Sequence, residues 1–123
     1  MHIKGLTIIP GLPPDSPELL QALKAADCFV LPSRHEPFGI AALEALDAAI
    51  PLIASRVGGL KDFLVDGRNA LLFDDNDIAS LKKAYDRLPA LRSTLIAEGQ
   101  KTARQYNWQT IAETLTGIYK ELL

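Results

Sequence analysis

The chain has 123 residues, of which 48% are hydrophobic and 23% are charged, and its formal net charge is −2. A chain of this length buries roughly two thirds of its unfolded surface, so it can fold as one domain without disulfides or metal. Its Lys and Arg residues are scattered rather than clustered, which argues against nucleic acid as a partner. With no transmembrane segment and no signal-peptide pattern at the N-terminus, we expect a cytoplasmic protein.

The first half of the chain alternates strand patterns with helix patterns. The predicted strands cover residues 6–9, 28–31, 52–54 and 70–73, and the predicted helices cover 17–26, 38–49 and 58–65. Ser16 and Pro17 supply a cap and a first-turn proline for the first helix. The unbroken apolar run at 28–31 is typical of a parallel strand covered on both faces, and we expect the next strand to be its neighbour.

The last third of the chain has only helical patterns. One helix is predicted from Ile78 to Leu88, a second begins at Leu91, and a third follows the cap Asn107, with Trp108 as a core anchor. Right-handed crossovers between the earlier strands predict an α/β fold. We therefore expect one domain, a three-layer α/β/α Rossmann-like half-domain with a short parallel sheet of about four strands.

An anion site is predicted in the loop after the second strand. In a parallel sheet, ligands collect beyond the carboxyl ends of the strands, where helix N-termini present unpaired N–H groups. Pro37 fits the first turn of the next helix, and Gly39 leaves the amides of Phe38, Gly39 and Ile40 unshielded. A phosphate or a carboxylate fits that positive helix end.

Two glutamates bracket this site. Glu36 lies in the loop, and Glu44 lies six residues beyond Phe38, about 9 Å along the helix axis. A diphosphate on the amides would bring a ribose to Glu44 and a sugar head group to Glu36. The alternative is a structural pair, in which Glu36 caps the helix and Glu44 binds a Lys or Arg. Because the helix is otherwise apolar, we expect it to be buried and Glu44 to need a partner.

Other residues are weaker candidates for the same site. Arg34 pairs with a phosphate, pairs with Glu36 or lies in solvent. His35 either contacts the donor sugar or lies on the surface without a role. Gly58 and Gly59 form either a second anion loop or, as we favour, a tight turn. Gly11 and Leu12 end the predicted first strand, where a nucleobase could stack or the loop could simply pack.

Two further features are assigned to structure rather than chemistry. The run Asp74-Asp75-Asn76-Asp77 invites a metal-site interpretation, but it lacks the Gly and final Glu of a calcium loop and precedes a helix, so it is predicted to cap that helix. Cys28 is the only cysteine, and we expect a reduced core residue rather than a nucleophile.

The segment Glu36-Pro37-Phe38-Gly39, four further residues and Glu44-Ala45 resembles the Glu-x7-Glu signature of the retaining glycosyltransferases of group 1 (family 4), which have the two-domain GT-B fold. The resemblance covers nearly the whole chain. Its other motifs match Ala26-Asp27 to Pro32-Ser33, Pro51 to Ser55, Gly58-Gly59, Asp66-Gly67-Arg68-Asn69 and Tyr106 to Leu122. Ala49 stands where this family usually has glycine.

The resemblance implies that the chain is the later part of a C-terminal, donor-binding domain. It implies that Glu44 holds ribose hydroxyls, that Glu36, our candidate catalytic residue, lies by the transferred sugar, and that the amides of 38–40 contact the diphosphate. A nucleotide sugar is then the donor substrate, departure of the diphosphate occurs on the front face of the sugar, and no metal cofactor is required.

The resemblance also implies missing partners. The family has an N-terminal acceptor domain and an Arg and a Lys that neutralise the diphosphate, and residues 1–5 supply neither. We therefore expect a truncated chain that is inactive alone. The alternative is a non-catalytic nucleotide-binding module, or a module that forms homodimers through the exposed edge of its sheet.

Overall fold

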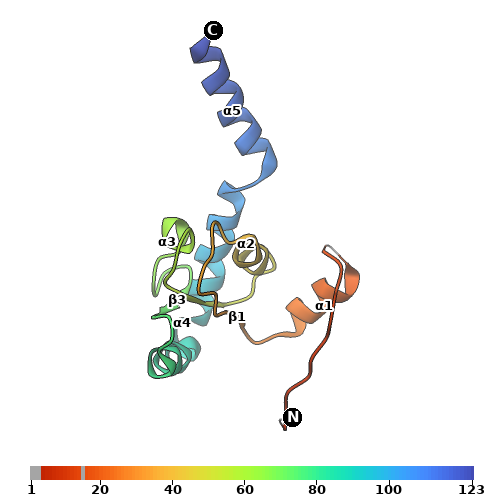
Figure 1. The fold of residues 1–123 in the computed structure, drawn as a ribbon, viewed down its shortest axis with the longest axis vertical. Coiled ribbons are helices and arrows are strands. Elements are labelled where there is room, and N and C mark those ends of the chain that lie inside the picture. Colours follow the sequence, from red (N-terminus) through yellow and green to blue (C-terminus); the bar gives the residue numbers. More distant parts are fainter. Residues whose placement is uncertain (1–3, 15) are drawn as a thin grey trace.

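A parallel three-stranded sheet forms the centre of the computed structural model, which describes residues 4–14 and 16–123 (Figure 1). The strand order is β1-β2-β3, with Phe29 paired to Leu52 and Ile53 paired to Leu71. In chain order the elements are α1 (Pro17–Ala25), β1 (Phe29–Leu31), α2 (Ile40–Asp47), β2 (Leu52–Ser55), α3 (Leu60–Phe63), β3 (Leu71–Phe73), α4 (Ile78–Gln105) and α5 (Trp108–Leu122).

Side chains alternate between two cores on the two faces of this sheet, as the pleat of a strand requires. On one face, strand residues pack with α2 and α3 in a cluster that contains Leu46, Leu52, Ala54, Phe63 and Leu72. On the other face, they pack with α4 in a cluster that contains Ile53, Leu71, Phe73, Ala84 and Leu88. The expected α/β class with a short parallel sheet and helical layers is confirmed.

The predicted first strand is absent, and the described sheet has three strands rather than about four. Leu6, Ile8 and Ile9 lie in an irregular segment and are 52%, 79% and 59% exposed. In Figure 1 this segment (dark red) runs along the outer edge of the molecule, beyond α1. A short apolar run becomes a strand only when its N–H and C=O groups find a ladder partner, and here they find none.

Strand β1 is consequently an edge strand. Its middle residue, Val30, is 40% exposed, so the expectation of a strand covered on both faces is wrong. Strands β2 and β3 do match that expectation, since all their residues are buried. The apolar pattern alone does not distinguish the central strand from the edge strand.

Helix α4 is one continuous helix of 28 residues, where the sequence predicted two helices. Pro89 lies inside it and removes one backbone hydrogen bond. The helix continues because both of its parts are held by packing: the first part covers β3, and the second part crosses to α2, where Gly99 lies against Leu46. Figure 1 shows the change of direction between the two parts.

The turn between α3 and β3 is fixed by two polar side chains of the Asp-Gly-x-Asn motif. The buried Asn69 accepts a hydrogen bond from Val65 N and donates to the carbonyl of Phe63 and to Thr102 Oγ1. Asp66 accepts from the amide of Leu72 at 2.9 Å. Asn69 therefore joins α3, the turn and the second part of α4.

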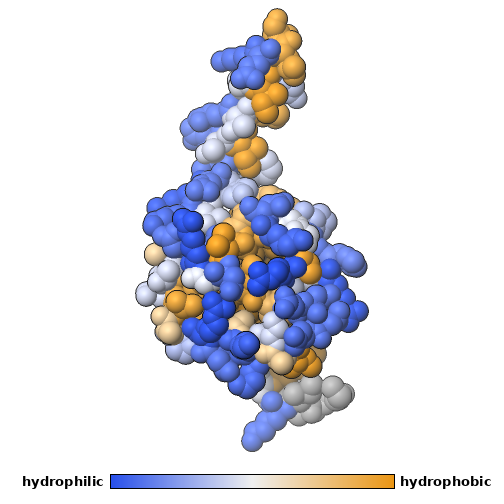
Figure 2. Space-filling model, turned by 90° about the vertical axis from the view of Figure 1, so that its left-hand side faces the viewer, coloured by the Kyte–Doolittle hydropathy of each residue, from blue (hydrophilic) through white to orange (hydrophobic). Residues whose placement is uncertain are grey.

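Helix α5 extends away from the rest of the chain, and none of its residues is buried (Figures 1 and 2). Asn107 caps it as predicted, accepting from Thr110 N at 2.8 Å. Trp108, however, is 85% exposed, so its assignment as a core anchor is wrong. Helical spacing shows which residues share a face but not whether that face has a partner. No helix in the described ranges is long and apolar enough to cross a membrane.

Helix α2 ends in a turn that normally uses glycine. The amide of Ile50 donates to the carbonyl of Ala45 at 3.1 Å, and that of Ala49 donates to Leu46 at 3.2 Å, which is the Schellman pattern. Ala49 has φ 61, a left-handed conformation in which its Cβ is strained. The glycine that the family resemblance leads us to expect here would therefore fit this turn without strain.

We expect Ala49→Gly to raise the free energy of unfolding by roughly 0.5–1 kcal/mol, because the relieved strain of about 1–2 kcal/mol exceeds the added chain entropy of glycine. Chemical denaturation measures the change. Ala48→Gly is the matched control: Ala48 has φ −71, which suits alanine, so this variant should be less stable. A loss of stability in Ala49→Gly would contradict this account of the turn.

Candidate functional site

The carboxyl ends of β1 and β2 are tied together beneath the candidate loop. Ser55, the last residue of β2, is fully buried, and its hydroxyl donates to the carbonyl of Ser33 at 2.5 Å. The same oxygen lies 3.4 Å from the carbonyl of Leu31. The sequence did not predict this contact of Ser55, because the partner is a backbone group distant in the chain. This contact fixes the start of the β1–α2 loop, residues 32–39.

Gly58 and Gly59 pack directly on the backbone of the β1–α2 loop. The amide of Gly59 donates to the carbonyl of Glu36 at 2.8 Å. A Cβ on Gly58 would lie 2.1 Å from that carbonyl oxygen, and one on Gly59 would lie 2.2 Å from the carbonyl oxygen of Pro37. Gly58 also has a positive φ of 47. The favoured interpretation as a tight turn is compatible with this geometry, and the turn additionally shapes the neighbouring loop.

Gly39 ends the loop and begins α2. Its φ of 110 is accessible to glycine, and a Cβ there would lie 2.5 Å from Leu60 Cδ2. The helix therefore starts at Ile40, later than the predicted Phe38. The first hydrogen bond of the helix runs from Leu43 N to the carbonyl of Gly39, and no side chain caps the amides that precede it. Uncapped amides at a helix N-terminus favour an anion.

Three aromatic rings lie beneath and beside this helix start. Phe38 comes from the β1–α2 loop, Phe63 from α3 and Tyr106 from the end of α4. Their ring centroids are 5.8 Å (Phe38–Phe63), 5.8 Å (Phe38–Tyr106) and 5.5 Å (Phe63–Tyr106) apart. These spacings are within the range of attractive aromatic pairs. The sequence did not predict that Tyr106 lies at the site.

The charged residues of the loop differ in their surroundings. Glu36 is half-buried, and its Oε2 accepts a 3.4 Å hydrogen bond from the hydroxyl of Ser33. Arg34 and His35 are exposed, and neither has an ion-pair partner within 4.0 Å among the described residues. A half-buried carboxylate beside the helix start can accept hydrogen bonds from a hydroxylated ligand.

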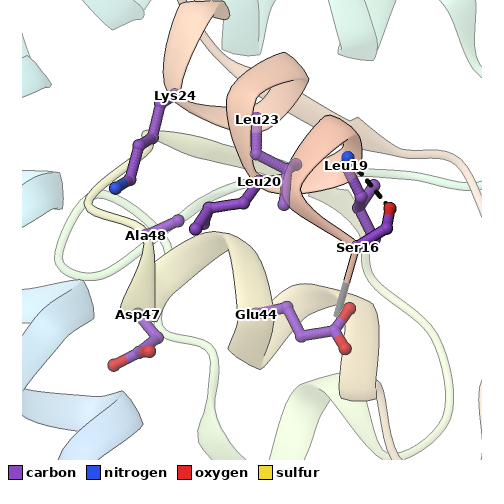
Figure 3. Close-up of a pocket in the computed structure, with 8 residues that line it drawn as sticks. All are labelled: Ser16, Leu19, Leu20, Leu23, Lys24, Glu44, Asp47 and Ala48. Atoms are coloured by element: carbon purple, nitrogen blue, oxygen red, sulfur yellow. Dashed lines mark hydrogen bonds between the residues drawn. The ribbon is translucent and has the colours of Figure 1, made fainter. Parts of the chain in front are cut away.

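Glu44 lies in a groove between α1 and α2 with a volume of about 390 Å³ (Figure 3). Leu20 and Leu23 of α1 point into this groove, and the carboxylate of Glu44 is directed toward the Ser16 end. Asp47 also lines the groove, but its carboxylate is directed away from that of Glu44. The groove therefore combines an apolar wall with a carboxylate that can accept hydrogen bonds.

The expected burial of α2 on every side is wrong. Ile40 is 66% exposed, and Glu44 and Asp47 are both exposed. Only one stripe of this helix faces the core. Another part of its surface lines the groove between α1 and α2, so α1 does not bury it. The expected cost of an unpaired buried carboxylate does not arise at Glu44. Within the described ranges, Glu44 also forms no ion pair, so the predicted alternative of an internal salt bridge is not what holds it.

The remaining candidates lie apart from this arrangement. Gly11 and Leu12 belong to the irregular segment before α1, so no strand carries them to the β1–α2 loop. Asp77 caps α4 by accepting from Ser80 N at 3.0 Å, as predicted. No group of three metal-ligating side chains is found in the part of the chain that the structure describes. Cys28 is a free, half-buried thiol whose pKa is raised by burial and by the nearby Asp27.

Comparisons with known proteins identify the family of this chain. Residues 4–115 match the model of the family "Glycosyl transferases group 1". The chain is 36% identical over 116 residues to a D-inositol 3-phosphate glycosyltransferase of Acidothermus cellulolyticus, covering 93% of this chain and 25% of the relative. It is 37% identical over 109 residues to a glycogen synthase of Mycobacterium tuberculosis, covering 85% and 26%.

Solved structures show the same fold. The sucrose-phosphate synthase of Thermosynechococcus elongatus matches with a TM-score of 0.72 and 34% identity over 82% of this chain and 26% of its own. HepE of Anabaena, solved in complex with UDP-glucose, matches with a TM-score of 0.66 and 25% identity over 79% and 29%. The chain thus spans about a quarter of the length of these relatives. Because the family model matches residues 4–115 and the relatives are more than 30% identical over most of this chain, the chain belongs to the group 1 glycosyltransferases.

Proposed function

We propose that this chain is the donor-binding part of the C-terminal domain of a retaining GT-B glycosyltransferase and that it binds a nucleoside diphosphate sugar. The observation that carries the proposal is the start of α2, where the amides after Gly39 have no side-chain cap while Glu44 of the same helix opens onto a groove. The uncapped amides at the helix start can bind the diphosphate, and the groove can hold the nucleoside.

The spacing along α2 fits such a ligand. Glu44 lies four residues beyond Ile40, about 6 Å along the helix axis, and the two sites are therefore joined by one rigid element. Ribose hydroxyls would donate to the exposed Glu44 carboxylate without requiring any internal ion pair to break. The half-buried Glu36 would accept hydrogen bonds from the sugar head group on the other side of the diphosphate.

The chemistry we propose is transfer with retention, in which the nucleoside diphosphate leaves from the face of the sugar that the acceptor attacks. Negative charge develops on the leaving phosphate, and the uncapped amides of α2 are fixed donors toward that charge. Arg34, exposed in the β1–α2 loop, is available as an added cation. No metal enters this scheme.

A second proposal concerns self-association. The outer edge of β1 has no strand partner in the described part of the chain, and Val30 on that edge is 40% exposed. An unpaired edge with an apolar side chain is a template for pairing with another copy. We propose a homodimer that pairs along β1.

The first test of donor binding is Glu44→Gln. Removing the charge should raise the Kd for UDP roughly tenfold, because hydrogen bonds to a charged acceptor contribute about 1.5–3 kcal/mol. The Kd for inorganic pyrophosphate, which has no ribose, should not change. Titration calorimetry measures both, and the melting temperature should stay constant because Glu44 is exposed and unpaired among the described residues.

Asp47→Asn is the matched control for this substitution. Asp47 lines the same groove, but its carboxylate is directed away from that of Glu44, so UDP binding should be unaffected (Figure 3). If Glu44→Gln lowers the melting temperature and leaves UDP affinity intact, Glu44 has a structural role and is not a ribose ligand.

The second test is activity. We expect the 123-residue chain alone to transfer no sugar from radiolabelled nucleotide sugars, because backbone amides supply only part of the charge stabilisation that the reaction needs. Product release from UDP-glucose, GDP-mannose and ADP-glucose measures this. Turnover that disappears in Glu36→Ala would show that the chain is sufficient for catalysis and would refute the expectation.

The third test concerns the sheet edge. Analytical ultracentrifugation at high micromolar concentration should detect a dimer, and Val30→Lys should dissociate it by placing a charge on the edge. Ile118→Lys on the exposed α5 is the control and should leave the dimer intact. A strictly monomeric parent chain, or a dimer lost only in Ile118→Lys, would rule out pairing along β1.

A further inference from the structure

The three aromatic rings connect the candidate donor site to the end of α4. Phe38 immediately precedes the glycine that starts α2, and its ring contacts both Phe63 and Tyr106 at 5.8 Å between centroids. Phe63 is nearly buried, whereas Phe38 is 43% exposed. The two inner rings therefore form a support on which the half-exposed Phe38 ring rests.

Backbone hydrogen bonds, rather than the side-chain hydroxyl, fix the position of Tyr106. It terminates α4, with its amide donating to the carbonyl of Ala103 at 3.0 Å. The next residue, Asn107, donates to the carbonyl of Arg104 at 2.6 Å and caps α5. Within the described chain the Tyr106 hydroxyl forms no hydrogen bond, so the aromatic ring is the part that acts on Phe38.

The backbone at Gly39 depends on this support. Glycine has few steric restrictions of its own, so its φ of 110 is maintained by neighbouring contacts. Beneath Gly39, those contacts come from Leu60 and Phe63. On the N-terminal side, they come through Phe38, whose ring is fixed by Phe63 and Tyr106. Without the contacts to Phe63 and Tyr106, Phe38 would be free to shift, and the flexible Gly39 backbone would lose a restraint that orients the amides at the start of α2.

We infer that Tyr106 is a positioning residue for the diphosphate, acting through Phe38 to hold the amides of Gly39 and Ile40 in the orientation that binds an anion. The inference rests on the proposed donor site and adds to it a residue from the far end of the domain. Tyr106 affects binding of the diphosphate alone, because the aromatic rings lie at the helix start and do not line the groove at Glu44.

This role differs from simple core packing in what it predicts for binding. A residue that only stabilises the fold changes the fraction of folded protein but not the affinity of each folded molecule. A positioning residue changes that affinity, and it does so equally for UDP and for inorganic pyrophosphate, since both carry the diphosphate. Loss of a ribose contact, by contrast, would affect UDP only.

The experiment compares Tyr106→Leu, which removes the ring, with Tyr106→Phe, which keeps it. With each Kd corrected for the folded fraction, Tyr106→Leu should raise Kd roughly tenfold for both UDP and pyrophosphate, and Tyr106→Phe should restore parent affinity. Leu88→Ala is the control on the opposite face of the sheet: it should lower the melting temperature without changing either Kd.

A second measurement does not need a ligand. In two-dimensional amide NMR spectra, Tyr106→Leu should shift the Gly39 and Ile40 signals and Tyr106→Phe should not, while the signals of Leu81 and Ala84 on the opposite face of the sheet should stay in place in both. If Tyr106→Leu does not fold, Phe38→Leu replaces it, since Phe38 is half-exposed and its loss should move the same two amides.

The outcomes separate the inference from the function on which it rests. Parent protein that binds neither UDP nor pyrophosphate refutes the proposed donor site, and it overturns the inference too, because no anion site is then left for Tyr106 to position. Parent protein that binds both, with unchanged affinity and unchanged amide signals in Tyr106→Leu, overturns only the role of Tyr106.

Discussion

The close approach of two backbone segments is the constraint on which the site depends. The turn at Gly58 and Gly59 lies against the carbonyls of Glu36 and Pro37 at distances that leave no room for a Cβ. One hydrogen bond, from Gly59 N to the Glu36 carbonyl, closes this contact. Because the contact sets the path of the β1–α2 loop, it determines where the half-buried Glu36 lies and how the chain enters Gly39 and α2.

Few buried polar side chains support this contact. Ser55 joins the ends of β1 and β2 through a backbone carbonyl, and Asn69 joins α3 to α4 through three hydrogen bonds. Both side chains are buried, and no buried side-chain N or O atom of the described chain lacks a partner. Satisfied buried groups of this kind make alternative arrangements costly, so the loop and the helix start are held in one geometry.

The rest of the chain is held less firmly. Among the residues that the structure describes, those before α1 and those of α1 and α5 include no buried residue, while α2, β2, β3 and α4 supply most of the core. The candidate groove therefore has one rigid wall, formed by α2, and one wall formed by a helix with no buried residue. This asymmetry places the amides proposed to bind the diphosphate on the firmly packed part of the molecule, and the nucleoside side of the proposed site beside the less firmly packed part.

The sequence by itself determined the local features, because each rests on neighbouring residues. Ser16, Asp77 and Asn107 form caps, the apolar runs at 52–54 and 70–73 form buried strands, and the Glu36 to Glu44 segment carries the resemblance to the glycosyltransferases. Tertiary structure decided what depends on a distant partner. Leu6 to Ile9 finds no strand to pair with, Pro89 is tolerated because packing holds α4 on both sides, and Trp108 stays exposed because no described element covers α5. Ser55 and Tyr106 reach the site only through contacts with residues far away in the chain, and such contacts leave no periodic signal in the sequence.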